Sequence, residues 1–165
     1  YIGYRLLADP YNMNQAVVGL LSIVSLSGIY SSAQIGALAD KPGRRKVLWA
    51  GTVLMLAGIA LALLEPIAWV VIGMLLFTFG FFGAHSVASS WIGRRATKAK
   101  GQASSLYLFS YYAGSSVAGT LGGVFWHLAG WNGIGLFIGA LLVVALLVAL
   151  HLARLPALPG NIKPA

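Results

Sequence analysis

The feature that most constrains this chain is a series of long apolar runs, separated by short segments that hold most of its charges. Each run is about 20 residues long, the length that a helix needs to cross a hydrocarbon core of roughly 30 Å. Of the 165 residues, 59% are hydrophobic and 8% are charged, whereas a soluble domain is about 25% charged. Because so few polar residues cannot cover a globular surface, the sequence predicts an all-α, polytopic membrane protein.

The apolar runs predict five membrane-spanning helices, bounded by charged loops and by turns that contain Pro, Gly or Asn. The predicted helices occupy residues 15–35, 45–64, 67–92, 102–126 and 133–152. They form a predicted transmembrane bundle over residues 15–152. We expect residues 1–14 to be the end of a preceding helix with an external loop, and residues 153–165 to be a poorly ordered, Pro-rich tail. Because the first residue is Tyr1 and not Met, we also expect the chain to begin inside a longer protein.

The basic residues fall almost entirely on one side of the predicted membrane, with Arg5 as the exception. Cytoplasmic loops of membrane proteins carry an excess of Lys and Arg, so the asymmetry predicts that this side, with the C-terminus, is cytoplasmic. The basic residues on this side are Lys41, Arg44, Arg45, Lys46, Arg94, Arg95, Lys98, Lys100, Arg154 and Lys163.

The same topology explains the net charge of +8 better than nucleic-acid binding does. The cations lie in short loops between apolar runs, with no aromatic-rich basic face beside them. The chain has no cysteine, which excludes disulfides and thiolate metal sites. We therefore expect a protein of the lipid bilayer that binds no nucleic acid, metal or cofactor.

The loop GALADKPGRRKVL, residues 36–48, contains an aspartate and two glycines in addition to the cations that a topology signal requires. Gly36 removes a side chain where a helix end passes another backbone. Asp40 is an anion at the end of a span, suited to the positive N-terminus of a neighbouring helix, and Arg44 is close enough in sequence to pair with it. The alternative is a loop that only assists membrane insertion and helix packing.

At these residues the sequence resembles the major facilitator superfamily of secondary transporters. The family's cytoplasmic signature reads Gly-x-Leu-Ala-Asp-Arg-x-Gly-Arg-Arg/Lys and joins the second and third helices of each six-helix half. Lys41 replaces the usual arginine, which conserves the charge. Within the family, the sequence most resembles bacterial inner-membrane efflux transporters, and this resemblance implies that the protein is located in the inner (plasma) membrane. The residues that match the signature are Gly36, Leu38, Ala39, Asp40, Gly43, Arg44 and Arg45.

The resemblance implies that the five helices are helices eight to twelve of a twelve-helix fold. The N-terminal half of such antiporters usually carries an arginine in its fourth helix, whereas the span at 67–92 has no charge before Arg94. The missing partner would be the N-terminal half of the same transporter. In the family the signature aspartate is thought to engage a helix of the opposite half and to hold the cytoplasmic side shut. Carried over, Asp40 is the latch anion, Arg44 its partner in the loop, and Gly36 the contact point.

The titratable side chain inside a predicted span is His85, about 10 Å from the cytoplasmic end at about 1.5 Å per residue. Histidine changes charge near neutral pH, so it is a proton-relay candidate; the alternative is a neutral imidazole bonded to a neighbouring helix. By resemblance this span lines the central cavity. That makes Ser86, Ser89 and, from the next span, Tyr111 further candidates. The serines could instead bond to their own helix backbone, and the tyrosine could be an interfacial anchor.

The predicted helix at 102–126 carries small residues at a spacing of four on two adjoining faces. Such spacing lets two helix backbones approach closely, so it predicts helix packing. A helix that slides or bends against its partner during a transport cycle would show the same pattern. One face holds Gly114, Ala118 and Gly122, and the adjoining face holds Gly119 and Gly123.

Together these features predict one half of a proton-coupled secondary transporter, an efflux antiporter for small organic solutes that works by alternating access. The alternatives are uptake of sugars or metabolites by the same fold, and a membrane assembly subunit that transports nothing. An enzyme is not expected, because His85 has no acidic or second histidine neighbour at a suitable spacing.

Overall fold

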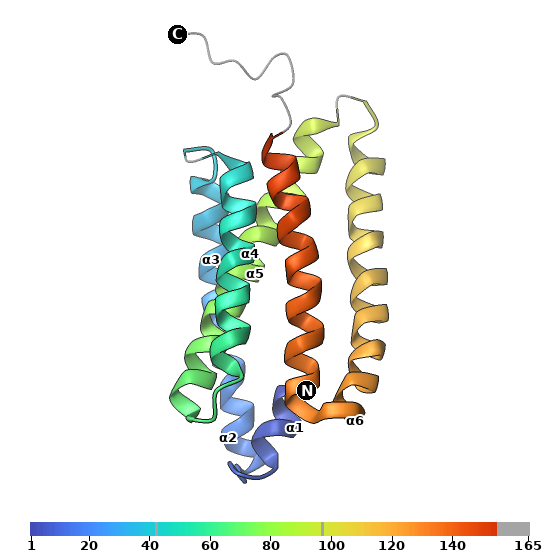
Figure 1. The fold of residues 1–165 in the computed structure, drawn as a ribbon. Helices are drawn as coiled ribbons and strands as arrows, with labels where there is room; N and C mark the ends of the chain where they lie inside the picture. Colours follow the sequence, from blue (N-terminus) through green and yellow to red (C-terminus); the bar gives the residue numbers. More distant parts are fainter. Residues whose placement is uncertain (42, 97, 155–165) are drawn as a thin grey trace.

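The protein is described by a computed structural model that covers residues 1–41, 43–96 and 98–154, and every regular element in these residues is a helix (Figure 1). Most of the predicted tail, residues 155–165, lies outside this described part. The elements are α1 (Ile2–Leu7), α2 (Gln15–Leu20), the 3-10 helix η1 (Leu21–Ile23), α3 (Val24–Leu38), α4 (Arg44–Ala62), α5 (Ile67–Arg95) and α6 (Lys100–Arg154).

The first predicted span corresponds to three consecutive elements, α2, η1 and α3, which together form one apolar helical segment over Gln15–Ala37. Asn14 caps the start of this segment: its side-chain oxygen accepts a hydrogen bond from the backbone N–H of Val17 at 2.9 Å. Such a cap satisfies one of the N–H groups that a helix start leaves unpaired. The second and third predicted spans are α4 and α5.

Helix α6 is two helices joined at a sharp bend. At about 1.5 Å per residue, its 55 residues are too long for a single crossing. The helical backbone breaks at Ala129 and at Gly130, whose φ of +55° is a conformation that glycine adopts without steric cost. Figure 1 shows the two parts running in opposite directions beside each other. They match the predicted helices at 102–126 and 133–152. Among the described residues, four helical segments are long and apolar enough to span a membrane, and the bend in α6 divides the last of them into two crossings.

Helix α5 packs against both α3 and α4. Two glycine pairs bring the backbones of α4 and α5 together. A Cβ at Gly58 would lie 2.7 Å from the carbonyl oxygen of Gly73, and a Cβ at Gly80 would lie 2.7 Å from that of Gly51. No larger side chain fits at such a crossing. Close backbone approach at small residues is a common way for helices to associate in lipid.

The small residues predicted to pack helices have few neighbours in this structure. A Cβ at Gly114 or at Gly119 would meet no atom within 4 Å. Gly122 and Gly123 instead face Tyr1, whose ring and hydroxyl lie 2.9 and 3.3 Å from the respective Cβ positions. The Tyr1 hydroxyl also donates a hydrogen bond of 2.7 Å to the carbonyl oxygen of Gly119. This helix face therefore receives Tyr1, the residue before α1, at one end, and close backbone packing is found between α4 and α5.

The outer surface of the bundle is apolar, as expected of a protein that lies in lipid. Leu128 and Leu136 are 76% and 73% exposed, whereas polar Ser31 is fully buried and donates a hydrogen bond of 2.6 Å to the carbonyl oxygen of Phe79. A soluble protein reverses this distribution, because water expels large apolar patches. The chain is thus an all-α membrane-spanning bundle.

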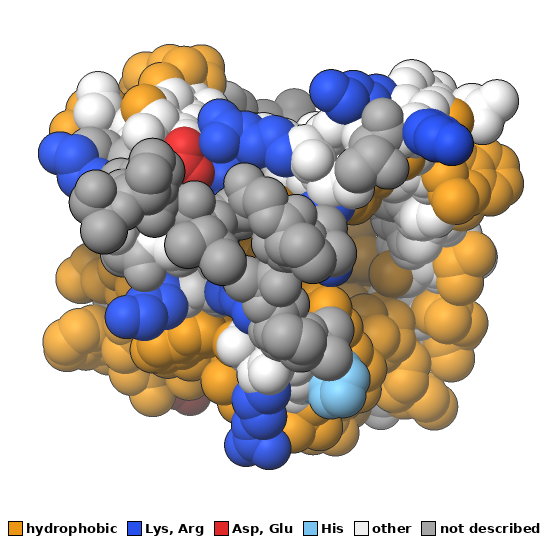
Figure 2. All heavy atoms as spheres, turned by 90° about the horizontal axis from the view of Figure 1, so that it is seen from above, with side chains coloured by type: hydrophobic (Ala, Val, Ile, Leu, Met, Phe, Trp, Pro, Cys, Tyr) orange, Lys and Arg blue, Asp and Glu red, His pale blue; other side chains and the backbone are white. Residues whose placement is uncertain are grey.

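The two ends of the bundle differ in charge. We call one of them the basic end: it contains the α3–α4 loop, the α5–α6 loop and the end of α6. Figure 2 shows Lys and Arg side chains gathered on this face. We call the opposite end, which contains α1, the α4–α5 turn and the bend in α6, the Arg5 end. The described cations of the basic end are Lys41, Arg44, Arg45, Lys46, Arg94, Arg95, Lys98, Lys100 and Arg154.

Candidate functional site

The predicted signature loop is a tight turn between α3 and α4. Gly43 precedes α4 with a φ of +96°, and its N–H donates to the carbonyl oxygen of Ala39 at 3.1 Å. A side chain at this φ would strain the backbone, which explains the glycine of the motif. The turn places Asp40 at the end of α3 and Arg44 at the start of α4, four residues apart.

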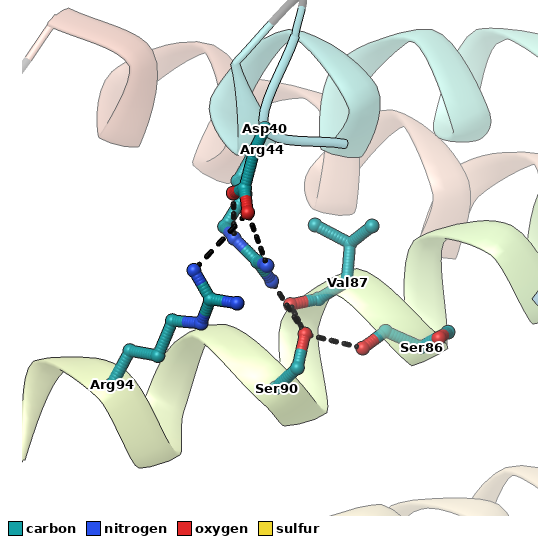
Figure 3. A network of polar contacts seen from close by, with 6 residues as sticks. All are labelled: Asp40, Arg44, Ser86, Val87, Ser90 and Arg94. Atoms are coloured by element: carbon teal, nitrogen blue, oxygen red, sulfur yellow. Dashed lines mark hydrogen bonds and ion pairs between the residues drawn. The ribbon is translucent and has the colours of Figure 1, made fainter. Parts of the chain in front are cut away.

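Two arginines hold the Asp40 carboxylate (Figure 3). Arg44 donates from Nε to Oδ1 at 2.8 Å and from a second nitrogen to Oδ2 at 3.4 Å. Arg94, from the end of α5, donates to Oδ2 at 3.1 Å. The side chains of Asp40 and Arg94 are 55% and 63% exposed, so solvent screens the second pair. The carboxylate therefore joins the α3–α4 loop to α5 and keeps one side open.

Arg44 is the anchored member of this network, since its side chain is only 9% exposed. A terminal nitrogen of its guanidinium donates to the hydroxyl oxygen of Ser90 at 2.5 Å. The Ser90 hydroxyl in turn donates to the carbonyl oxygens of Ser86 and Val87, at 2.9 and 3.1 Å. These contacts fix the guanidinium against α5, so Asp40 meets a cation that is already in position.

Gly36 is a contact point with α5 in this structure. A Cβ at this position would lie 2.7 Å from the hydroxyl oxygen of Ser86, one turn of α5 before Ser90. The Ser86 hydroxyl donates to the carbonyl oxygen of Ser32 on α3 at 3.1 Å. Gly36 and Arg44 of the motif thus lie against Ser86 and Ser90, which are spaced by one helical turn.

The charges around Asp40 favour its ionised form. The hydrogen bonds from Arg44 hold the pKa of the Asp40 carboxyl below its ordinary value, and the positive charges of Arg44 and Arg94 act in the same direction. The carboxylate is therefore an anion at any pH near neutrality.

Arg94 and Ser90 belong to this network although the sequence motif does not include them. Both lie at the end of α5, about fifty residues after Asp40, and only the crossing of α3, α4 and α5 brings them together. In the sequence, the pair Arg94 and Arg95 at the end of an apolar span could have suggested a role for Arg94, but it could not have shown that Asp40 is its partner.

Two other arginines of the basic end lie near the ring of Trp91, in the WIGRR segment at the end of α5. The guanidinium groups of Arg45 and Arg95 lie 5.9 and 5.4 Å from its ring centre.

His85 lies in an aromatic cluster between α5 and the first part of α6. Its Nδ1 is hydrogen-bonded to the hydroxyl of Tyr107 at 2.9 Å. Its ring centre lies 4.6 Å from that of Tyr111 and 5.9 Å from that of Phe81. The structure thus brings together two predicted residues, His85 and Tyr111, and adds Tyr107 as the bonded partner.

The two predicted serines of α5, Ser86 and Ser89, take no part in the hydrogen bond between His85 and Tyr107. Ser86 bonds to α3, as described above, and Ser89 lies half-buried on α5. Neither shares a hydrogen bond with His85 among the described residues. The described residues also contain no group of three His, Cys, Asp or Glu side chains that could hold a metal ion.

A second network at the Arg5 end was not predicted. The Arg5 guanidinium donates to the carbonyl oxygens of Ala62 and Leu64, the latter at 2.9 Å, where α4 leaves these groups unpaired. It also lies 5.0 Å from the ring centre of Trp131, whose Nε1 donates to the Ala62 oxygen at 2.7 Å. Tyr11 completes the network, because its hydroxyl oxygen accepts a hydrogen bond of 3.1 Å from Arg5. Four segments of the chain meet there.

Comparison with known proteins gives relatives that are named as transporters, among them the following three. The "Inner membrane transport protein YnfM" of Escherichia coli (strain K12) is 58% identical over 154 residues, which cover 93% of this chain and 37% of the relative. The "Uncharacterized MFS-type transporter YybF" of Bacillus subtilis (strain 168) is 48% identical, over 98% of this chain and 40% of the relative. An "Uncharacterized transporter" of Buchnera aphidicola subsp. Schizaphis graminum (strain Sg) is 44% identical, over 93% and 37%.

The chain spans about two-fifths of the length of these relatives. No solved structure matches it significantly. The sequence model of the Major Facilitator Superfamily matches residues 2–165, which is nearly the whole chain. The helical bundle, the signature loop and this match agree: the chain belongs to the Major Facilitator Superfamily, a family of transporters and not of enzymes.

Proposed function

We propose that the chain is the C-terminal half of a proton-coupled secondary transporter, which exports small organic solutes across the bacterial inner membrane by alternating access. The family and the names of the relatives support the transport role and the inner membrane. The length of those relatives leaves room for an N-terminal half. The observation that carries the proposal is the Asp40 network, in which the carboxylate is held by two arginines and is still exposed on one side.

The Asp40 carboxylate can accept a further donor because it is 55% exposed. Arg44 fixes it from the protein side through Ser90, and Arg94 approaches from the end of α5. The N-terminus of a helix presents unpaired N–H groups and a partial positive charge, which suit such an anion. In our proposal a helix of the N-terminal half docks there and closes the basic end.

The basic end faces the cytoplasm in this proposal, because its excess of Lys and Arg follows the positive-inside rule. Closing it leaves the transporter open to the outside. Breaking the contact with Asp40 then favours the inward-open state. A coupling of about 1–3 kcal/mol is enough to bias two such states.

His85 is our candidate for the proton pathway. It lies inside a span, where ionisable groups are costly and mark functional sites. The bond to Tyr107 at 2.9 Å gives the imidazole a partner through which a proton can pass. The same bond is what a purely structural histidine would make, so pH-dependent transport has to distinguish the two roles.

The function is tested with the full-length protein in liposomes that contain a pH-sensitive dye. Gradients of sugars, amphipathic aromatic compounds and other small metabolites are imposed one at a time, with empty liposomes as the control. We expect at least one solute to move together with protons. Solute movement without proton movement would contradict the coupling, and no movement of any solute would favour the assembly-subunit alternative.

A further inference from the structure

A groove of about 540 Å³ runs between α3 and α4, with α5 behind it. The groove exists because small residues lie where the three helices meet. Gly51 and Gly80 allow α4 and α5 to touch, and Ala84 adds only a methyl group. Larger apolar side chains form the walls, among them Leu54 and Phe79.

The groove opens at the surface of the bundle. Ala50, in its α4 wall, is exposed in this structure. A void lined by carbon atoms forfeits dispersion contacts, so in a bilayer it is filled by something apolar. A lipid acyl chain has the apolar chemistry that such a groove accepts.

One cation is among the described residues that line the groove. Lys41 contributes to the lining, and the other described residues that line the groove are all apolar. The neighbouring Asp40 carboxylate is already paired with Arg44 and Arg94. Within the described part of the chain, Lys41 makes no ion pair. Its ammonium group therefore remains available to an external anion.

We propose that this groove is a binding site for an anionic phospholipid, with an acyl chain between α3 and α4 and the headgroup phosphate on Lys41. Basic pockets between membrane helices on the cytoplasmic side are suited to anionic headgroups. The basic end has the required sign, and the predicted topology places it at the inner leaflet. The site shares Ala39, Lys41 and Val47 with the signature loop, but it uses neither the Asp40 carboxylate nor the His85 cluster.

The test is native mass spectrometry of the purified, delipidated full-length protein. Phosphatidylglycerol and phosphatidylcholine with identical acyl chains are compared as added lipids. We expect phosphatidylglycerol to bind about fivefold more tightly, as one basic residue near an anionic headgroup warrants. Lys41→Ala should abolish this preference, and Lys41→Arg should retain it. Ala50→Phe should fill the groove and weaken the binding of both lipids.

Two matched variants control for changes away from the groove. Lys98→Ala removes an exposed cation of the same end, and Ala140→Phe adds a ring at an exposed position of α6. Both should bind lipid as the unmodified protein does. Equal binding of the two lipids to the unmodified protein would overturn the proposal. So would a Lys41→Ala variant that behaves like Lys98→Ala, or an Ala50→Phe variant that behaves like Ala140→Phe.

Discussion

At the residue scale, the pairing of Asp40 with its two arginines has a defined dependence on pH. Because the pKa of Asp40 in the folded protein lies below its ordinary value of about 4, the pairing is fully present above that ordinary value. It is lost only as the pH falls through the lowered pKa. Between pH 5 and 8 Asp40 stays charged, so any pH dependence of transport in that range must come from another group.

His85 is the residue to which we assign that dependence. In the full-length protein, His85→Gln and His85→Ala should remove the pH dependence of solute-driven proton flux between about pH 5 and 8. Tyr107→Phe removes the hydroxyl bonded to Nδ1 and should shift the pH profile while transport continues. The measurement is the flux in proteoliposomes over a pH series.

Tyr112→Phe provides the control, because Tyr112 is exposed and its ring contacts Tyr111 and not His85. It should leave the pH profile unchanged. A profile identical to that of the unmodified protein in both His85 variants would end the relay proposal and leave His85 as a structural residue.

At the element scale, the pairing of α4 with α5 depends on glycines at matching positions. Gly51 and Gly58 lie seven residues apart on α4, and Gly73 and Gly80 lie seven apart on α5. The two helices run in opposite directions, so Gly51 meets Gly80 and Gly58 meets Gly73. Each meeting point brings backbone against backbone.

Gly73→Leu should therefore destabilise the bundle strongly. The new side chain would overlap with the backbone of α4, where a Cβ alone already lies 2.6 Å from the Ala62 nitrogen. Overpacking of this kind costs about 1–3 kcal/mol. Thermal unfolding of the full-length protein in detergent should show a clear fall in Tm.

Gly19→Leu is the matched control, because a Cβ at Gly19 on α2 would meet no atom within 4 Å. Its Tm should stay close to that of the unmodified protein. Similar Tm values for the two variants would show that the α4–α5 crossing is looser than described.

At the scale of the whole molecule, the sequence was sufficient to predict the membrane spans, the signature loop and the grouping of cations at one end. These features are local: they depend on runs of apolar residues and on motifs within a dozen positions. The sharp bend that divides α6 falls between two predicted spans, as a Gly- and Asn-containing turn allows.

The contacts between distant segments could not be predicted in the same way. Arg94 reaches Asp40, and Arg5 reaches the end of α4, only because of how the helices cross. The small residues from Gly114 to Gly123 showed the stronger repeat, yet the close backbone contacts between α4 and α5 are made by glycines of those two helices. Small residues indicate that a helix can approach a partner, but the partner is set by the rest of the bundle.

The central claim is that Asp40 holds the basic end closed in the complete transporter. The direct measurement uses the full-length protein with a cysteine in place of Ser89, which lies half-buried on α5. Labelling by a membrane-impermeant maleimide from the basic end reports how often that end is open. The control is Asp9→Asn, which removes a carboxylate bonded to Asn12 in the loop after α1.

If the claim is right, Asp40→Asn expresses normally and raises the labelling rate about fivefold or more, as the loss of a coupling of 1 kcal/mol or above requires. The Asp9→Asn rate should equal that of the protein with Asp40 and Asp9 intact. An unchanged labelling rate in Asp40→Asn would contradict the latch and would leave the loop with a role in insertion and packing alone.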